Sequence, residues 1–376
     1  MPYIDLHTKP FDGGTIAKLE IFEDYAEAWI PTWVMQEVPK IHVFDFFSGP
    51  GYDREQVPGS PIRLLEKILS YLGNFFQKKT KVVLHLNEFE PNKKAQVKFE
   101  NLQKNCEEFL NAHPKLRHFL KIEYYNKDAK VLFFELLPLI KEHPSLVYLD
   151  QNGVKFIAQE YVSELEKLSG TDFLYFASSS YFKRLGNTEE FQKVIPFTAE
   201  ELAKEKQTNM HRFVASRLRK DLPEYTDLKL FPFSIKKGAN IYGIIFGAKH
   251  FRAVDKFLKI AWKRNEVNGE ADFDIDDDET KAGYDLFGRK GLTKIEKFQA
   301  DLEEKLLKGG LQNNRGVLMH TYLSGHIPDH ANEVIKKIKG KLLRYDGRTA
   351  GVNYDNVFKK RNIVNFKLVG NQNGTK

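Results

Sequence analysis

Short apolar runs alternate with longer segments of helical periodicity along the first two thirds of the chain. The short runs have the length of β-strands, and apolar residues in the segments between them recur at helical spacing. Strands that alternate with helices form parallel sheets covered on both faces, so the pattern predicts an α/β fold. The predicted strands are 41–47, 81–88, 119–126, 145–153 and 171–180, and the predicted helices among them include 15–29, 60–76, 92–112 and 129–143.

Boundary residues mark two of these helices. The first, 15–29, follows a pair of glycines and precedes Pro31, which predicts its end. The second, 60–76, begins with Ser60 followed by Pro61, and proline at the first helical position is typical of a helix start. We therefore expect the first helix to stop at the proline and the second to run to residue 76.

The rhythm changes after residue 180. Residues 226–247 have the pattern of two strands joined by a Gly-containing turn at 236–240, which predicts an antiparallel hairpin. The largely polar residues around 180–222 are interpreted as a helical insertion, either a lid or a segment that faces the substrate. Residues 1–264 are thus expected to form a Rossmann-like domain, with parallel strands and an antiparallel terminal hairpin.

The remaining residues suggest a linker and a second domain. The acidic run in 265–290 lacks the glycine and the glutamate that a calcium loop needs, because Asp277 and Gly283 occupy those places. It is therefore interpreted as a solvated linker. Residues 291–370 contain a helix at 293–308, a further helix pair separated by a glycine turn, and a ribbon punctuated by glycines. This order predicts a winged-helix-like domain.

Composition narrows the class of protein. The 376 residues suit two domains, and the 41% hydrophobic content is enough for folded cores. A single cysteine, Cys106, excludes internal disulfides and cysteine-based metal sites. No apolar run reaches the roughly 20 residues that span a membrane. We expect a cytoplasmic protein with no membrane association and no metal.

The positive charge is concentrated near the C-terminus. Of the net charge of +7, residues 329–367 supply 10 − 4 = +6, from ten Lys or Arg and four Asp or Glu residues. Such a cluster favours phosphate contacts and a nucleic-acid partner, DNA or RNA, although a solvated face or a protein contact would use the same residues. The nucleic-acid candidates are Lys336, Lys337, Lys339 and Arg344. His326 and His330 are expected to cap or lie at the surface, since Pro328 separates them.

The stretch 45–51, DFFSGPG, is the strongest candidate for a ligand site. A buried strand ends in Asp45, and Gly49 and Gly51 follow. The third glycine of a dinucleotide loop is replaced by Arg54, and no Gly-Lys-Ser/Thr follows, so neither an NAD site nor a P-loop is predicted. An acid at the end of an apolar strand needs a partner, which suggests a cationic ligand.

This stretch resembles the first motif of class I S-adenosylmethionine-dependent methyltransferases. The resemblance implies that Asp45 receives hydrogen bonds from the cofactor's ammonium, that Glu88 holds the ribose hydroxyls, and that Asp128 with Asn126 meets the adenine. Helix capping is the alternative for Glu88 and Asp128, and Glu90 is expected to turn outward. The cofactor-binding candidates are Asp45, Phe46, Ser48, Gly49, Pro50, Gly51, Glu88, Asn126 and Asp128.

Most of residues 11–345 resembles the three-Cys-motif partner (TcmP) family. The resemblance rests on the N-terminal helix with Lys18, on Asp-Phe-Phe-Ser-Gly-Pro-Gly followed by Gly59-Ser60-Pro61, and on the segments NEFEPNKKAQVKFENL, LVYLDQNGVKFI, IYGIIFGAKH and YLSGHIPDHANEVIKKIK. It implies a methyltransferase-like Rossmann core, a C-terminal domain of winged-helix type, and a radical-enzyme partner.

The chain departs from the family at 150–153, where Asp-Gln-Asn-Gly replaces Asp-Pro-aromatic-Gly. An adenine methylase is disfavoured because the aromatic platform is missing, and a cytosine methylase because Cys106 is not in a Pro-Cys loop. Asp150 remains the catalytic candidate, with helix capping as the alternative. Two hypotheses follow: a methyltransferase that acts on a nucleic acid, or an inactive Rossmann-like protein that binds nucleic acid or another partner.

Overall fold

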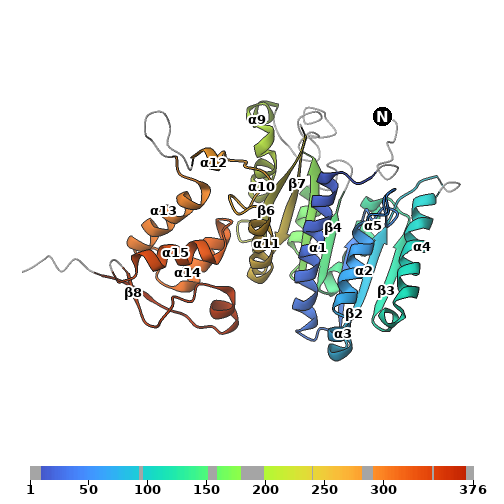
Figure 1. Ribbon diagram of the computed structural model, residues 1–376, viewed down its shortest axis with the longest axis horizontal. Helices are drawn as coiled ribbons and strands as arrows, with labels where there is room; N and C mark the ends of the chain where they lie inside the picture. The colour runs from blue at the N-terminus through green and yellow to red at the C-terminus, as the bar shows by residue number, and fades with distance from the viewer. Residues whose placement is uncertain are drawn as a thin grey trace, which may run out of the picture. The chain divides into compact units, whose positions relative to one another are not determined.

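The chain divides into two compact units, Met1–Lys249 and His250–Lys376, each described by itself. The structure, a computed structural model, describes residues 10–92, 96–150, 159–178, 199–238, 240–281, 291–340 and 343–369 (Figure 1). The division falls before the helix at 251–264, which the sequence analysis assigns to the first domain. The second half of the expected insertion is described, whereas 179–198 lies outside the described residues.

A seven-stranded sheet forms the centre of the first unit, with strand order β3-β2-β1-β4-β5-β7-β6. Strands β1 to β5 are parallel, and β7 pairs antiparallel with both β5 and β6. The predicted parallel sheet with an antiparallel terminal hairpin is therefore confirmed. The strands are β1 (Lys40–Asp45), β2 (Lys81–Asn87), β3 (Leu120–Tyr125), β4 (Ser145–Leu149), β5 (Thr171–Ser178), β6 (Lys229–Lys237) and β7 (Asn240–Ala248).

Helices cover both faces of this sheet (Figure 1). Helix α1 packs on β4, β6, α2 and α3, and α2 packs on α4. Helices α5, α6 and α10 contribute to a core cluster on the other face. The helices are α1 (Gly13–Val34), α2 (Ser60–Ser70), α3 (Leu72–Lys78), α4 (Val97–Ala112), α5 (Ala129–Glu142), α6 (Gln159–Glu166), α9 (Ala199–Lys204) and α10 (Met210–Lys220), with short 3-10 turns η2 (Pro114–His118) and η4 (Gln207–Asn209).

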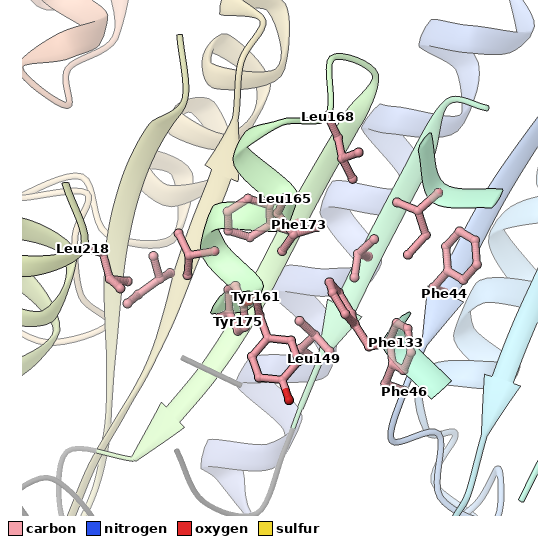
Figure 2. Close-up of a cluster of buried hydrophobic side chains, with 14 of the residues drawn as sticks. Phe44, Phe46, Phe133, Leu149, Tyr161, Leu165, Leu168, Phe173, Tyr175 and Leu218 are labelled. Atoms are coloured by element: carbon pink, nitrogen blue, oxygen red, sulfur yellow. The ribbon is translucent and has the colours of Figure 1, made fainter. Parts of the chain in front are cut away.

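The core cluster fixes which strand residues point to which face. Figure 2 shows Phe44 and Phe46 of the β1 segment beside Phe133 of α5, with Leu149 and Tyr175 from β4 and β5 in the same cluster. Side chains alternate along a strand, so neighbours of these residues face the α1 side. The end of β1 therefore presents Asp45 to the face that carries α1 and α2.

A ladder of buried aromatic and imidazole rings crosses β1, β2 and β3. His42 Nδ1 lies 2.8 Å from His85 Nε2, and His85 Nδ1 lies 3.0 Å from the Tyr125 hydroxyl. Burial lowers the pKa of His42 to about 3 and that of His85 to about 4. Both imidazoles are thus held in the neutral form over the physiological range.

Two helix boundaries differ from the expectation. Helix α1 continues through Pro31 to Val34. Proline cannot donate to the carbonyl four residues earlier, but the Tyr71 hydroxyl donates to that carbonyl, Glu27 O, at 3.2 Å. The expected helix 60–76 is interrupted at Tyr71, whose φ of −99° and ψ of 13° separate α2 from α3. One tyrosine thus marks the break in one helix and supplies a hydrogen bond near the end of another.

The second unit is mostly helical and ends in a small ribbon. Strand β8 pairs antiparallel with β9. The order of helices followed by a ribbon agrees with the expectation from the sequence, although a winged helix is not established by it. The elements are α11 (Phe251–Arg264), α12 (Asp278–Lys281), α13 (Lys294–Leu307), α14 (Asn314–Leu323), α15 (Pro328–Ile338), β8 (Leu343–Tyr345), the π-helical turn η5 (Asp355–Lys359) and β9 (Phe366–Leu368).

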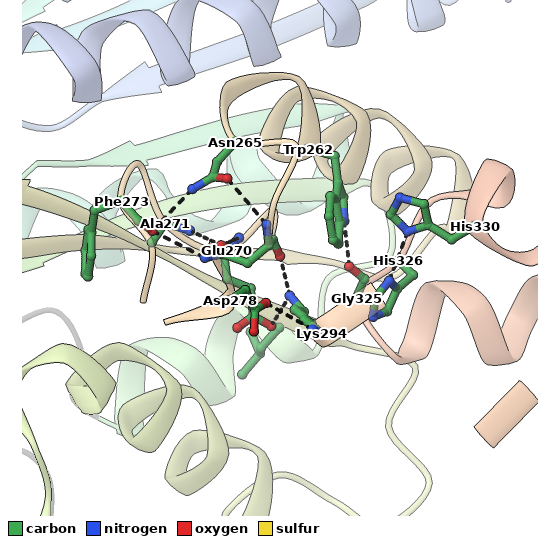
Figure 3. Close-up of polar contacts among 12 residues, drawn as sticks. Trp262, Asn265, Glu270, Ala271, Phe273, Asp278, Lys294, Gly325, His326 and His330 are labelled. Atoms are coloured by element: carbon green, nitrogen blue, oxygen red, sulfur yellow. Dashed lines mark hydrogen bonds and ion pairs between the residues drawn. The ribbon is translucent and has the colours of Figure 1, made fainter. Parts of the chain in front are cut away.

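Trp262 organises the centre of this unit (Figure 3). Its indole nitrogen donates to Gly325 O at 2.9 Å, and its ring contacts both His326 and His330. The two histidines are 2% and 9% exposed and their Nδ1 atoms lie 3.0 Å apart. The expectation that they lie at the surface is therefore wrong, because they close the core around the tryptophan.

The described part of the acidic segment, 265–281, is held by specific hydrogen bonds. Asn265 and Asn268 donate to Phe273 O, and Asn268 accepts from the backbone of Ala271 (Figure 3). Asn268 and Ala271 are both fully buried. This part is a packed turn rather than the solvated linker expected from its charge, since the asparagines satisfy its backbone.

Candidate functional site

The loop after β1 adopts a backbone that only glycine allows easily. Gly49 and Gly51 have φ of 65° and 98°. A Cβ on Gly51 would lie 3.3 Å from the Asn105 side chain. The Asn105 amide of α4 donates to Pro50 O at 2.7 Å, and Gly51 O accepts from Gly59 N at 2.8 Å. The loop is thus fixed from both sides by residues close to other elements.

Asp45 ends β1 as a buried carboxyl group. It is 1% exposed and accepts hydrogen bonds from Ser60 Oγ at 2.6 Å and Phe47 N at 3.1 Å. Burial, helped by the negative charges of Asp150 and Glu88, raises its pKa to about 7 against these two bonds. A carboxyl in this state favours a cationic partner, because a positive charge would stabilise its ionised form.

Glu88 follows β2 and faces the glycine loop. Its Oε2 accepts from Gly49 N at 3.0 Å, and the Lys98 ammonium of α4 lies 4.0 Å from Oε1. The start of α4 is capped instead by Glu90, which accepts from Lys98 N and Phe99 N. Glu90 therefore does not turn outward as expected, and the capping alternative for Glu88 is wrong.

The candidates after β3 are less directed toward the loop. Asn126 Oδ1 accepts from Glu90 N at 2.9 Å, and its amide nitrogen is buried without a hydrogen-bond partner among the described residues. Asp128 is exposed and caps α5 by accepting from Lys130 N at 2.9 Å. Of this pair, only Asn126 keeps a buried polar atom for a ligand.

Two of the loop candidates, Phe46 and Ser48, make their contacts within the protein. The Phe46 side chain lies in the core cluster on the opposite face from Asp45, and its N–H donates to Tyr148 O. Ser48 donates from Oγ to Asp45 O at 3.0 Å and from its N–H to Asn87 O. These residues shape the loop, and neither directs a free side chain toward a ligand.

Asp150, the residue after β4, forms an ion pair with α1. Lys18 Nζ lies 2.7 Å and 2.8 Å from its two carboxylate oxygens and 4.6 Å from the centroid of the Phe176 ring. Gln151, Asn152 and Gly153, where the chain departs from the family pattern, lie outside the described residues. Asp45, Glu88 and Asp150 thus follow three adjacent strands, β1, β2 and β4, on one edge of the sheet.

This edge is where an open α/β sheet binds its ligand. The chain leaves β1 toward β2 on one side and returns to β4 on the other, so β1 and β4 flank the point where the strand order reverses. In the sequence, Ser60 is recognisable only as a helix start and Lys18 only as part of the resemblance. Cys106 is buried in α4 and burial raises the pKa of its thiol to about 12, which excludes it as a nucleophile at neutral pH.

The basic candidates of the second unit differ in what they contact. Lys336, Lys337 and Arg344 are exposed, but the Lys337 ammonium lies 2.9 Å from Glu303 of α13. Lys339 donates to Arg348 O at 3.1 Å and lies over the Tyr345 ring. A pocket of about 310 Å³ beside Lys337 is lined by Glu296, Glu303 and Glu333. The face of α15 toward α13 is therefore acidic as well as basic.

Comparisons with known proteins add little to this geometry. No family profile matches the sequence, and no curated protein matches it. Similar solved structures include the O-methyltransferase TomG of Streptomyces achromogenes with S-adenosylmethionine (TM-score 0.32, 12% identity, 65% of this chain and 92% of that chain). Another is Trm1 of Pyrococcus horikoshii with the same compound (TM-score 0.33, 14% identity, 66% of this chain and 59% of that chain). TM-scores and identities this low support no argument about this chain, so the description of its fold rests on the observed strand order alone.

Membrane and metal features are limited to what is described. No helix in the described ranges is long and apolar enough to cross a bilayer. Within the same ranges, no group of three or more His, Cys, Asp or Glu side chains could hold a metal ion.

Proposed function

We propose that this chain is an S-adenosylmethionine-dependent methyltransferase that acts on a nucleic acid. The observation that carries the proposal is Asp45, a buried carboxyl at the strand-order reversal, beside a glycine loop and between Glu88 and Asp150. Three acids on adjacent strand ends suit a ligand that bears positive charge and no phosphate. When bound, the cofactor supplies an electrophilic methyl group on a sulfonium.

The residues present fit this cofactor by their chemistry. Asp45 would accept from its ammonium, Glu88 would hold its ribose hydroxyls, and the two loop glycines leave room beside them. The buried amide of Asn126 would donate to the adenine. Asp150 would face the methyl acceptor. A desolvated site of fixed dipoles and charges needs no reorganisation when it acts.

Calorimetric titration with S-adenosylmethionine tests the cofactor assignment. We expect binding by the unmodified protein and a loss of at least tenfold in Asp45→Asn, since a hydrogen-bonded charge is typically worth about 1.5–3 kcal/mol. Glu90→Gln is the matched control: it changes an acid beside Glu88 that caps α4, and its affinity should stay within twofold. If millimolar cofactor gives no heat of binding, the assignment of the chain as an S-adenosylmethionine-dependent enzyme is refuted.

The nucleic-acid partner rests on the basic residues of the second unit, for which we infer a winged-helix-like role. Lys336 and Arg344 are expected to contact phosphates. The double variant Lys336→Gln, Arg344→Gln should therefore bind RNA and DNA more weakly. The slope of the logarithm of its binding constant against the logarithm of the salt concentration should be smaller by about two. Lys337→Gln serves as control because Glu303 already pairs this lysine. Binding that is insensitive to salt would contradict the assignment.

The second candidate is an inactive Rossmann-like protein that binds nucleic acid or another partner. The observation that favours it is the sequence Asp-Gln-Asn-Gly at 150–153, which lacks the proline and aromatic residue of the family pattern. Such a protein would bind nucleic acid without cofactor and transfer no methyl group. The radical-enzyme partner stays a prediction from the resemblance. The cytoplasmic location stays a prediction from the composition.

A further inference from the structure

Lys18 joins the candidate site from an element far away in the sequence. Helix α1 carries it across the end of the sheet, where its ammonium contacts both oxygens of Asp150 and lies over Phe176. The side chains of Lys18 and Asp150 are only 15% and 19% exposed. An ammonium that bonds both oxygens of a carboxylate restricts its rotation. The pair therefore fixes where the Asp150 carboxylate points.

Tyr148 adds a second, independent observation. It is 1% exposed, and its hydroxyl has no hydrogen-bond partner among the described residues. Its ring stacks on Phe22 of α1 with centroids 3.7 Å apart, so the phenol cannot turn away. Burial raises the pKa of Tyr148, and the next largest causes are Asp150 and Asp45. Asp45 is the register partner of Tyr148 on β1, and Asp150 lies two positions after Tyr148 in the chain.

A buried hydroxyl beside two acids points to a ligand, because buried polar groups in folded proteins are almost always hydrogen-bonded. Tyr148 and Asp150 share a face of β4 by strand alternation, and Asp45 is opposite Tyr148 in the parallel register. The unpartnered hydroxyl, the oriented carboxylate and the buried acid therefore belong to one face of the sheet, at the neighbouring ends of β1 and β4.

We propose that Lys18, Tyr148 and Asp150 form the subsite that receives the methyl acceptor, with Lys18 as a positioning residue that orients the Asp150 carboxylate. The inference rests on the proposed function and deepens it. An ionised carboxylate can only accept hydrogen bonds, so the acceptor presents an N–H or O–H group to Asp150. Acceptors without such a hydrogen, such as tertiary amines and thioethers, are not held there.

The subsite can be tested without knowing the acceptor, through the preference for S-adenosylmethionine over S-adenosylhomocysteine. The two probes differ by the sulfonium charge, so their affinity ratio reports charges near the methyl group. Lys18→Met should raise this ratio and Asp150→Asn should lower it, each by roughly tenfold for a unit charge at about 10 Å and an effective dielectric constant of about 20. Lys18→Arg should stay within twofold of the unmodified protein.

The matched control is Lys67→Met. Lys67 also bonds α1, through Glu27 at 2.8 Å and Glu23 at 3.1 Å, and both glutamates lie more than one helical turn beyond Lys18. Its loss should leave the ratio unchanged. If a variant only loosens α1, binding of both probes should weaken equally and the affinity ratio should not change. If the two charges lie beside the methyl group, Lys18→Met and Asp150→Asn should shift the ratio in opposite directions.

The outcomes separate this inference from the proposed function. If the unmodified protein binds S-adenosylmethionine but Lys18→Met and Asp150→Asn leave the ratio unchanged, or shift it the same way, the subsite is wrong and the cofactor site stands. If the unmodified protein binds neither probe, both fail. Tyr148→Phe should not lower the melting midpoint of the free protein. A fall of several degrees would show that the hydroxyl is already bonded within the chain and would remove it from the subsite.

Discussion

Replacement of Asp45 by asparagine is expected to stabilise the free protein by an amount that grows with pH. Burial raises the pKa of Asp45 to about 7, from an ordinary value of 3.8. Between these two values the folded state keeps a proton that the unfolded chain releases, so stability is full at low pH and is lost as pH rises. Asparagine has no proton to lose, so the contribution of position 45 to the pH dependence of stability should vanish.

The size of the effect follows from the shift. About 3 pKa units at about 1.4 kcal/mol each give a loss of about 4 kcal/mol in the free energy of unfolding between about pH 4 and pH 7. Replacing the carboxyl acceptor of the Ser60 hydroxyl by an amide costs about 1 kcal/mol. The asparagine variant should therefore be slightly less stable than the parent near pH 4 and about 3 kcal/mol more stable above about pH 7.5.

Urea unfolding at several pH values measures this difference. Trp262 belongs to the second unit, so a Trp262→Phe background leaves Trp29 and Trp33 as fluorescent reporters of the first unit. Subtracting the two curves cancels the titrating groups that do not interact with Asp45. A difference that stays constant from about pH 4 to pH 8 would refute the reasoning, since it would mean that Asp45 is not a buried carboxyl with a raised pKa.

Three further outcomes are expected from urea unfolding. Gly51→Ala should lower the free energy of unfolding by about 1–3 kcal/mol, because its φ is 98° and Asn105 is close; an unchanged value would contradict the tight loop. Glu90→Ala should cost about 1 kcal/mol through the lost cap of α4 and leave cofactor affinity unchanged. His42 and His85, with pKa values lowered to about 3 and 4, should destabilise the fold as pH falls below about 6.5, and His85→Phe should weaken that dependence.

The sheet could be predicted from the sequence because its signals are local. Apolar runs, their lengths and the glycines after Asp45 are visible without tertiary structure, and they indicate the strands and the loop. Residues at strand ends, such as Glu88 and Asp150, follow from the same reading, since parallel strands bring their carboxyl ends to one edge. The choice between Glu88 and Glu90 did not follow, because it depends on which carboxylate reaches the start of α4.

Partners from other elements could not be predicted in this way. Ser60 meets Asp45, and Lys18 meets Asp150, only because α2 and α1 pack on that face of the sheet. The continuation of α1 past Pro31 likewise depends on the Tyr71 hydroxyl, 40 or so positions later in the chain. The charge of 265–281 was misleading for a related reason: asparagine side chains bond the backbone of that turn, and Ala271 and Ile275 are buried with it.

The anchoring of α1 has a consequence for the order in which the chain is made. Asp12, which caps the helix, pairs with Lys237 of β6; Tyr25 bonds Asp172 of β5 at 2.7 Å and contacts Phe246 of β7. Helix α1 is synthesised before β5, β6 and β7, so these contacts form only after those strands have been made. A nascent chain that ends between Asp150 and Ala248, the last residue of β7, therefore carries Asp45, Glu88 and Asp150 without all the contacts that place α1 and Lys18 beside them.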